Sequence, residues 1–144
     1  MIALDTNILV YAHREDSPWH EPAYRVLESL AEARSSWAVP WPCIHEFLAV
    51  VTHPRIYSPP SPLSAALDQV DAWLESPSLL LLRESEGYWD GLRRLLEQGQ
   101  VSGPMVHDAR VAALCVHNGV RELWTADRDF GRFPGLSVRN PLLD

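Results

Sequence analysis

Four acidic residues stand where a carboxylate could do chemistry. They are Asp5, Glu46, Asp108 and Asp127. Asp5 directly follows the apolar run Ile2 to Leu4, and Asp127 follows a second run that ends at Thr125. Taken alone, each aspartate is more typical of a helix cap or a turn. Because sites form at the carboxyl ends of parallel strands, two acids delivered to that edge indicate a shared site.

Asp108 falls in the first turn of a helix predicted from Val106 to Asn118. It lies on the rim of the apolar face, beside Ala112. Such a carboxylate either complements the helix dipole or stands ready for a cation. His107 and Arg110 are predicted to point away from this rim, so His107 is not expected to be a ligand.

Glu46 lies in a helix predicted from Pro42 to Thr52, nearly opposite its apolar stripe. Periodicity alone therefore predicts a solvated surface residue. If all four acids converged, each like-charged pair at ~5 Å would cost roughly 3 kcal/mol at an effective dielectric of ~20. A bound cation would relieve this repulsion, and oxygen-only ligands favour magnesium or manganese over zinc.

Short apolar strands alternate with helices along the chain. The predicted strands are 2–4, 37–39, 79–82, 122–125 and 136–138. The predicted helices are 7–13, 18–34, 42–52, 63–75, 86–98 and 106–118. Ser17 is expected to cap the second helix with Pro18 at its first position, and Leu79 to Leu82 to form a buried strand. This order predicts a single α/β domain over 1–144, a three-layer α/β/α sandwich around a short-stranded, mostly parallel sheet.

Composition narrows the class of protein further. No apolar run approaches the ~20 residues of a membrane span, and Asp5 interrupts the first run, so neither a membrane anchor nor an export signal is expected. Cys43 and Cys115 lie in apolar stretches and are expected to be buried free thiols of a cytoplasmic protein. The net charge of −7 argues against a polyanionic partner, although bound divalent cations would offset part of it.

Four segments of the sequence resemble the motifs of the PIN-domain nucleases in order and spacing. They are LDTNILVYA (4–12), HEF (45–47), VHDARVAAL (106–114) and TADRDF (125–130). The resemblance covers essentially the whole chain. Within the family it looks like the VapC toxins of bacterial toxin–antitoxin pairs. The proline-rich HPRIYSPPSPLS and closing FGRFPGLSVRNPL stretches also resemble one subgroup of these toxins.

The resemblance implies a function and a site. Asp5, Glu46, Asp108 and Asp127 would be the catalytic, metal-binding acids, which overrides the helical-wheel expectation for Glu46. Thr6, Asn7 and Thr125 would orient carboxylates by hydrogen bonds. The implied reaction is hydrolysis of RNA phosphodiester bonds with Mg²⁺ or Mn²⁺. The implied partners are RNA, a small antitoxin whose tail enters the groove, and a second copy in a homodimer.

Asp129 has two interpretations. It either assists the metal site or caps the turn after the last motif strand while Phe130 packs into the core, and the cap is favoured. All twelve basic residues are arginines, whose planar fork suits phosphate. Candidates for RNA contact are Arg110, Arg128 and Arg132. Tyr11, Trp19 and Trp41 could stack on bases, although core positions are the favoured prediction for the tryptophans.

Other classes of protein remain possible at this point. A haloacid-dehalogenase-type phosphohydrolase would need a second acid where Asn7 stands and typically a lysine, and the chain has no lysine. A catalytically inactive nuclease-fold binding module would not need all four acids. A housekeeping RNA-processing nuclease of the same fold is the alternative to a toxin.

Overall fold

A five-stranded, all-parallel sheet forms the centre of the computed structural model, which describes residues 1–143. Its strands are β1 (Ile2–Leu4), β2 (Trp37–Pro40), β3 (Leu79–Leu82), β4 (Glu122–Trp124) and β5 (Ser137–Arg139). They lie in the order β3-β2-β1-β4-β5. Ile2 is paired with both Trp37 and Glu122, which sets the register around the central strand.

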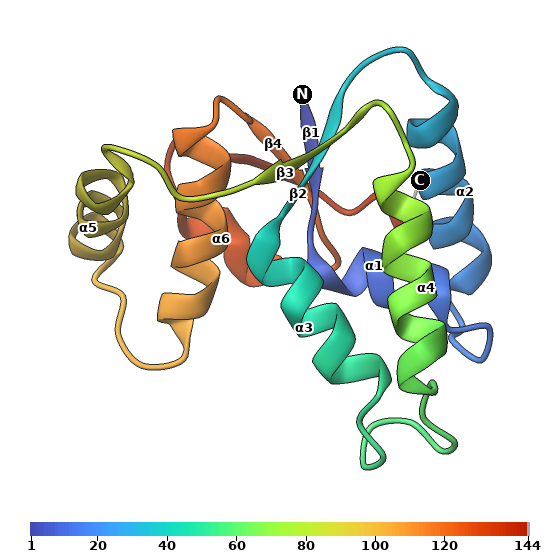
Figure 1. Cartoon of the computed structure of the whole chain (residues 1–144). Coiled ribbons are helices and arrows are strands. Elements are labelled where there is room, and N and C mark those ends of the chain that lie inside the picture. The colour runs from blue at the N-terminus through green and yellow to red at the C-terminus, as the bar shows by residue number, and fades with distance from the viewer. Residues whose placement is uncertain (144) are drawn as a thin grey trace.

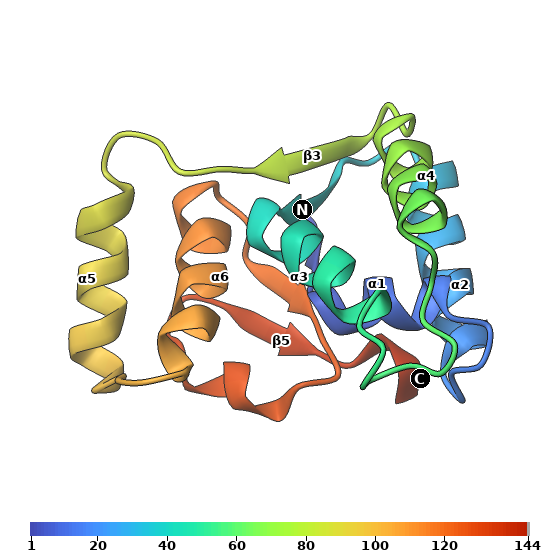
Figure 2. The ribbon, with the colours of Figure 1, turned by 60° about the horizontal axis from the view of Figure 1, so that its bottom comes forward.

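Six helices connect and cover the strands. They are α1 (Thr6–His13), α2 (His20–Glu32), α3 (Trp41–Val51), α4 (Leu63–Leu74), α5 (Tyr88–Gly99) and α6 (Met105–His117). Two short 3-10 helices follow, η1 (Arg128–Arg132) and η2 (Pro141–Leu143). Figure 2 shows α5 and α6 on one side of the strands and α2 and α4 on the other. The predicted three-layer α/β/α fold is therefore confirmed.

The strand order explains where a site can form. β1 leads into α1 and β2 leads into α3, and these two helices leave the sheet in contact with each other (Figure 1). α6 precedes β4 and runs against the strand direction, which brings its N-terminal turn to the same edge. The carboxyl ends of the central strands are thus surrounded by the first turns of three helices.

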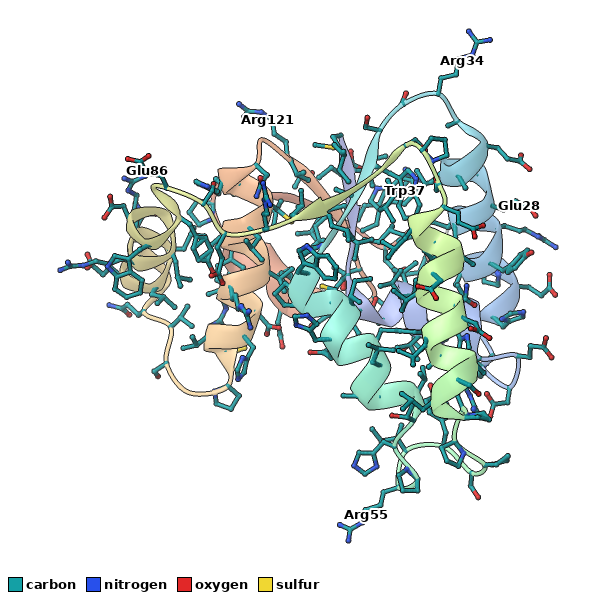
Figure 3. All side chains as sticks on the ribbon, viewed as in Figure 1. Glu28, Arg34, Trp37, Arg55, Glu86 and Arg121 are labelled. Atoms are coloured by element: carbon teal, nitrogen blue, oxygen red, sulfur yellow. The ribbon has the colours of Figure 1, made fainter. Side chains whose placement is uncertain are left out.

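The core lies between these layers and is built from aliphatic and aromatic side chains. Trp37 is 1% exposed and its indole N–H donates to the Ser78 hydroxyl at 3.2 Å. Figure 3 shows Trp37 within the fold while Arg34 and Glu86 project outward. Cys43 and Cys115 are buried free thiols, as predicted.

Some local predictions were wrong. The second helix begins at His20, not at Pro18, because Ser17 accepts from the Trp19 N–H in the preceding turn. β3 is an edge strand with only one neighbour, so Leu80 is 46% exposed where a buried strand was expected.

The core positions predicted for the six tryptophans are confirmed for three and wrong for three. Trp73 and Trp124 are partly buried and pack against the core. Trp37 is buried, but Trp19, Trp41 and Trp89 are exposed at 41, 37 and 62%. They lie at or beside helix N-termini on the surface, where no second layer covers them. Within residues 1–143, no helix has the length and apolar character that crossing a bilayer requires.

Candidate active site

A cleft of about 290 Å³ opens at the carboxyl edge of the sheet, and all four predicted acids line it. We call it the acidic cleft. Asp5 comes from the end of β1, Glu46 from α3, Asp108 from α6, and Asp127 from the loop after β4. Residues separated by more than a hundred positions in the sequence therefore share one concave surface.

Asp5 is the most buried and most tightly held of the four. It is 7% exposed, and its backbone N–H still pairs with the Trp124 carbonyl at 3.0 Å. One carboxylate oxygen accepts from the Thr6 backbone N–H at 2.8 Å and from the Cys43 thiol at 3.6 Å. The other accepts from the Thr125 hydroxyl at 2.8 Å. These donors hold the carboxylate in one orientation, and Thr6 contributes through its backbone.

Asn7 links the residue that follows β1 to the residues that follow β4. Its amide nitrogen donates to the Thr125 hydroxyl oxygen at 3.0 Å and, more weakly, to Asp5 at 3.5 Å. Its amide oxygen accepts from the Ala126 N–H at 3.1 Å. The Thr125 oxygen also accepts from the Asp127 N–H at 3.0 Å. The loop carrying Asp127 is thereby positioned against the N-terminus of α1.

The turn after β4 is capped by Asp127, not by Asp129. Asp127 accepts from the Asp129 N–H at 2.9 Å, at the start of η1. Asp129 is exposed, whereas Phe130 is 1% exposed and anchors the turn in the core. The cap predicted for Asp129 was therefore wrong, because a cap must stand before the turn and accept from its first amides.

Burial and repulsion between carboxylates raise the pKa of two of the acids, Asp5 and Asp108. Burial raises the pKa of Asp5 from 3.8 to about 6. The hydrogen bonds from Thr125 and Thr6 oppose this rise, and the negative charge of Glu46 adds to it. Partial burial, and then the charges of Asp127, Asp129 and Glu46, raise the pKa of Asp108. Each of these acids therefore sits in a field that favours a proton or another cation.

The donor set fits a hard divalent cation. The acids offer only carboxylate oxygens, which Mg²⁺ and Mn²⁺ prefer. As the side chains stand, no three His, Cys, Asp or Glu residues within 1–143 already have the arrangement of a closed metal site. The fit consequently rests on the chemistry of the carboxylates and on their repulsion across the cleft.

Helix periodicity had described Glu46 correctly but incompletely. Glu46 is exposed, as the wheel predicted, and it also lines the acidic cleft. His107 lines the cleft too, although it was predicted to point away. It also lines an adjoining hollow between α3 and α6, together with Arg110 and His45. The wheel could not show this, because it gives the direction of a side chain relative to its own helix and not what stands opposite.

The candidate RNA-binding residues come from two elements, α6 and η1. Arg110 is 3.7 Å from the Glu84 carboxylate, while Arg128 and Arg132 are exposed on η1. Tyr11 lines the acidic cleft, but Trp19 and Trp41 do not.

Tyr57 also lines the cleft, and no sequence pattern had indicated it. The one available signal was an isolated aromatic residue in the proline-rich segment that follows the helix of Glu46.

The fold and the cleft define a class, three-layer α/β/α proteins with an acidic cleft at the carboxyl edge of a parallel sheet. The PIN domain family model matches residues 2–136. The chain therefore belongs to the PIN-domain family, and two relatives that are 36% and 31% identical to it place it among the VapC ribonucleases. Ribonuclease VapC43 of Mycobacterium tuberculosis is 36% identical over 142 residues, covering 99% of this chain and 96% of that protein. Ribonuclease VapC48 of the same species is 31% identical, covering 95% and 94%.

Solved structures agree with this assignment. VapBC2 from Rickettsia felis, bound to a DNA fragment from its promoter, superposes with a TM-score of 0.68 at 26% identity, covering 97% of this chain and 98% of that chain. Mycobacterium tuberculosis VapC20, a sarcin–ricin loop cleaving toxin, superposes with a TM-score of 0.69 at 14% identity, covering 94% and 98%. At that identity the second likeness shows the fold alone.

Proposed function

We propose that this chain is a divalent-metal-dependent endoribonuclease and the toxin component of a toxin–antitoxin pair. The observation that carries the proposal is the gathering of Asp5, Glu46, Asp108 and Asp127 around one cleft. The relatives named ribonucleases support RNA as the substrate. The Rickettsia felis neighbour, a VapBC pair on promoter DNA, supports an antitoxin partner.

In this proposal the four acids hold Mg²⁺ or Mn²⁺. When bound, the cation lowers the pKa of a water molecule and neutralises charge on the phosphoryl oxygens. Asp5 is the fixed ligand, because its neighbours hold its carboxylate in place. Asp127 is positioned through its backbone N–H on Thr125. Glu46 and Asp108 complete the negative field from α3 and α6.

The chain works in the cytoplasm, forms a homodimer, and is inhibited by a small antitoxin protein that covers the acidic cleft. Its buried free thiols suit a reducing compartment. Arg110, Arg128 and Arg132 are proposed to contact RNA phosphates, and Asp129 adds negative charge near Asp108.

The test is cleavage of a mixed single-stranded RNA pool with Mg²⁺, with Mn²⁺ and with EDTA. We expect cleavage with either metal and none with EDTA. Asp108→Asn should lower the rate by at least about a hundredfold, the scale of losing preorganised charge at a reacting centre. Asp90→Asn is the matched control, because Asp90 lies in the first turn of α5 as Asp108 does in α6, but outside the cleft.

Full cleavage in EDTA would overturn the metal dependence. No cleavage, together with no metal binding by calorimetry that depends on Asp5 or Asp108, would favour an inactive binding module. Cleavage that is not suppressed by the protein encoded beside this chain, and that does not arrest growth when the chain is expressed, would favour a housekeeping RNA-processing nuclease.

A further inference from the structure

The segment 53–62 between α3 and α4 forms one wall of the acidic cleft through Tyr57. It contains four prolines and no regular helix or strand. A loop of this kind would ordinarily vary in position. Here it is tied to α1 by side-chain contacts of His13 and Arg14.

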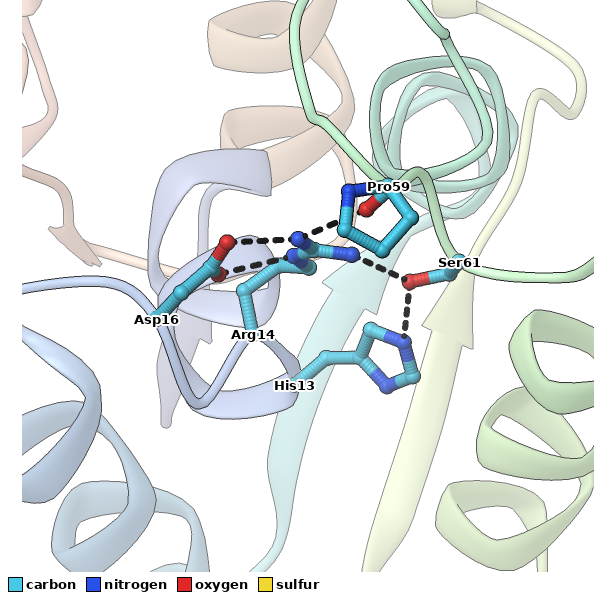
Figure 4. A network of polar contacts seen from close by, with 5 residues as sticks. All are labelled: His13, Arg14, Asp16, Pro59 and Ser61. Carbon is cyan, nitrogen blue, oxygen red and sulfur yellow. Dashed lines mark hydrogen bonds and ion pairs between the residues drawn. The ribbon is translucent and has the colours of Figure 1, made fainter.

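Arg14 is the centre of these contacts. Its guanidinium donates to Asp16 at 2.6 and 2.9 Å, to the Pro59 carbonyl at 3.0 Å and to the Ser61 hydroxyl at 3.2 Å (Figure 4). The Arg14 side chain is only 11% exposed. All three nitrogens of the planar guanidinium donate hydrogen bonds, which fixes the position of the loop relative to the end of α1.

Ser61 provides the second tie. It is 7% exposed, its backbone N–H donates to the Val51 carbonyl at 2.8 Å, and its hydroxyl lies 2.9 Å from His13 Nε2. His13 Nδ1 in turn lies 3.1 Å from Gln69 on α4. The far end of the loop is therefore attached to α3 through Val51 and to α1 through His13, and Figure 4 shows the second of these contacts. His13 in turn links α1 to α4 through Gln69.

These ties position the ring of Tyr57. The Arg14 guanidinium carbon lies 4.2 Å from the ring centroid, a cation–π contact on one face. The ring is half-buried, and other parts of it line the cleft together with Tyr11. An aromatic ring held by a guanidinium whose own position is fixed by four hydrogen bonds has little freedom left to lose when a ligand packs on it.

The apolar part of the cleft lies one helical turn from its acids. Val50 follows Glu46 by one turn of α3, and Val10 follows Thr6 by one turn of α1, a rise of about 5.4–6 Å in each case. Tyr57 and Tyr11 line the cleft with these valines. A chain whose phosphate lies at the acids would thus have an apolar and aromatic surface beside it, which suits a nucleobase and not a second phosphate.

We propose that Tyr57 packs against a base of single-stranded RNA next to the scissile phosphate, and that Arg14 is a positioning residue that acts through Tyr57. This inference rests on the proposed nuclease function. The base that Tyr57 contacts is unpaired in this proposal, because a base in a duplex has no free face for an aromatic ring.

The first test separates binding from chemistry with a fluorescein-labelled, unstructured RNA oligonucleotide. Tyr57→Ala should raise KM about tenfold, within the range measured for stacking one base, and change kcat less than about threefold. Tyr57→Phe keeps the ring and should retain a KM near that of the parent. Tyr24→Ala is the control, because Tyr24 is an exposed tyrosine of α2 outside the cleft. Equal losses for Tyr57→Phe and Tyr57→Ala would overturn the stacking role.

The second test asks whether Arg14 acts through Tyr57. Arg14→Gln should raise KM by a similar factor and speed amide hydrogen exchange in residues 53–62. In the double variant with Tyr57→Ala, KM should be no higher than in Tyr57→Ala alone, since residues that act through one another are not additive. If KM of the double variant rose by the product of the two single-variant factors, the positioning role of Arg14 would be overturned.

The third test keeps this inference separate from the proposed function. A series of RNA oligonucleotides is used, each with one abasic site at a different position. One member should lack the base that Tyr57 contacts, and on it the parent and Tyr57→Ala should have the same KM. Binding is also measured by anisotropy in EDTA on Asp108→Asn, with and without Tyr57→Ala. If the parent does not cleave RNA but RNA binding still depends on Tyr57, the proposed nuclease function alone is refuted. Cleavage with no Tyr57 effect on any substrate would refute the base contact alone.

Discussion

The Thr125 hydroxyl donates to Asp5 at 2.8 Å, and its oxygen simultaneously accepts the Asp127 backbone N–H at 3.0 Å. One side chain that is 1% exposed therefore sets the orientation of one acid and the backbone position of another. The two acids follow the adjacent parallel strands β1 and β4, so this contact links the two halves of the site.

Thr125→Val removes that link while keeping the side-chain shape. We expect the pKa of Asp5 to rise further above about 6, because the hydroxyl donor now lowers it. The free energy of unfolding near pH 8 should fall by about 1.5–3 kcal/mol, the range for a hydrogen bond to a charged group. Carboxyl NMR titration and urea unfolding measure the two effects. Thr52→Val, which removes a hydroxyl bonded to the Leu48 carbonyl, should leave the Asp5 titration unchanged.

Without metal, the protein should lose stability as pH rises from about 4 to about 6. Asp5 has a higher pKa in the folded state than its value of 3.8 in the absence of burial, so the folded state binds more protons in this window. The unfolding free energy then decreases with pH, by up to about 3 kcal/mol from this group. Asp108 shifts in the same direction.

The measurement is urea unfolding in EDTA across this pH range, for the parent and for Asp5→Asn. The difference between the two proteins isolates Asp5 from the ordinary surface carboxylates. A parent whose pH dependence matches that of Asp5→Asn would contradict the raised pKa.

Mg²⁺ or Mn²⁺ should stabilise the folded protein, and more strongly at pH 7.5 than at pH 5, because the cation competes with protons on Asp5 and Asp108. At a hundred times the dissociation constant the gain is about 2.7 kcal/mol. Thermal unfolding in metal and in EDTA measures it. Asp5→Asn and Asp108→Asn should lose most of the gain, whereas Asp90→Asn should keep it. A gain that is the same in all four proteins would place the cation elsewhere.

Phe130→Ala tests the anchor of the turn that carries Asp127. Phe130 is 1% exposed and its ring centroid lies 6.1 Å from that of Phe133. Truncation should cost about 3–5 kcal/mol of unfolding free energy, as for other buried aromatic residues. Trp89→Ala, at an exposed aromatic, should change it by less than about 0.5 kcal/mol. Urea unfolding of both variants checks the contrast.

Much of the site was predictable from local pattern. Asp5 and Asp127 were placed because each follows a short apolar strand, and parallel strands end at a common edge. The three-layer fold followed from the alternation of strands and helices. Both inferences depend on backbone periodicity and chain order, which are properties that the sequence carries directly.

Other features required the assembled molecule. Periodicity gives the direction of a side chain relative to its own helix axis, but not what stands opposite. It therefore predicted an exposed Glu46 without the cleft that Glu46 lines, and it turned His107 away from a cleft that His107 also lines. Arg110 was assigned to RNA by its chemistry, while the tertiary structure brings it to 3.7 Å from Glu84.

Tyr57 shows most clearly what sequence periodicity cannot predict. Its segment has no period from which a direction can be inferred, and its position depends on Arg14 reaching across from α1 to Pro59 and Ser61. The sequence by itself determined the family, the order of the layers and the acids at the strand ends, because these depend on neighbours along the chain. Only the tertiary structure decided which side chains from separate elements share the cleft, because that depends on distances between residues far apart in sequence.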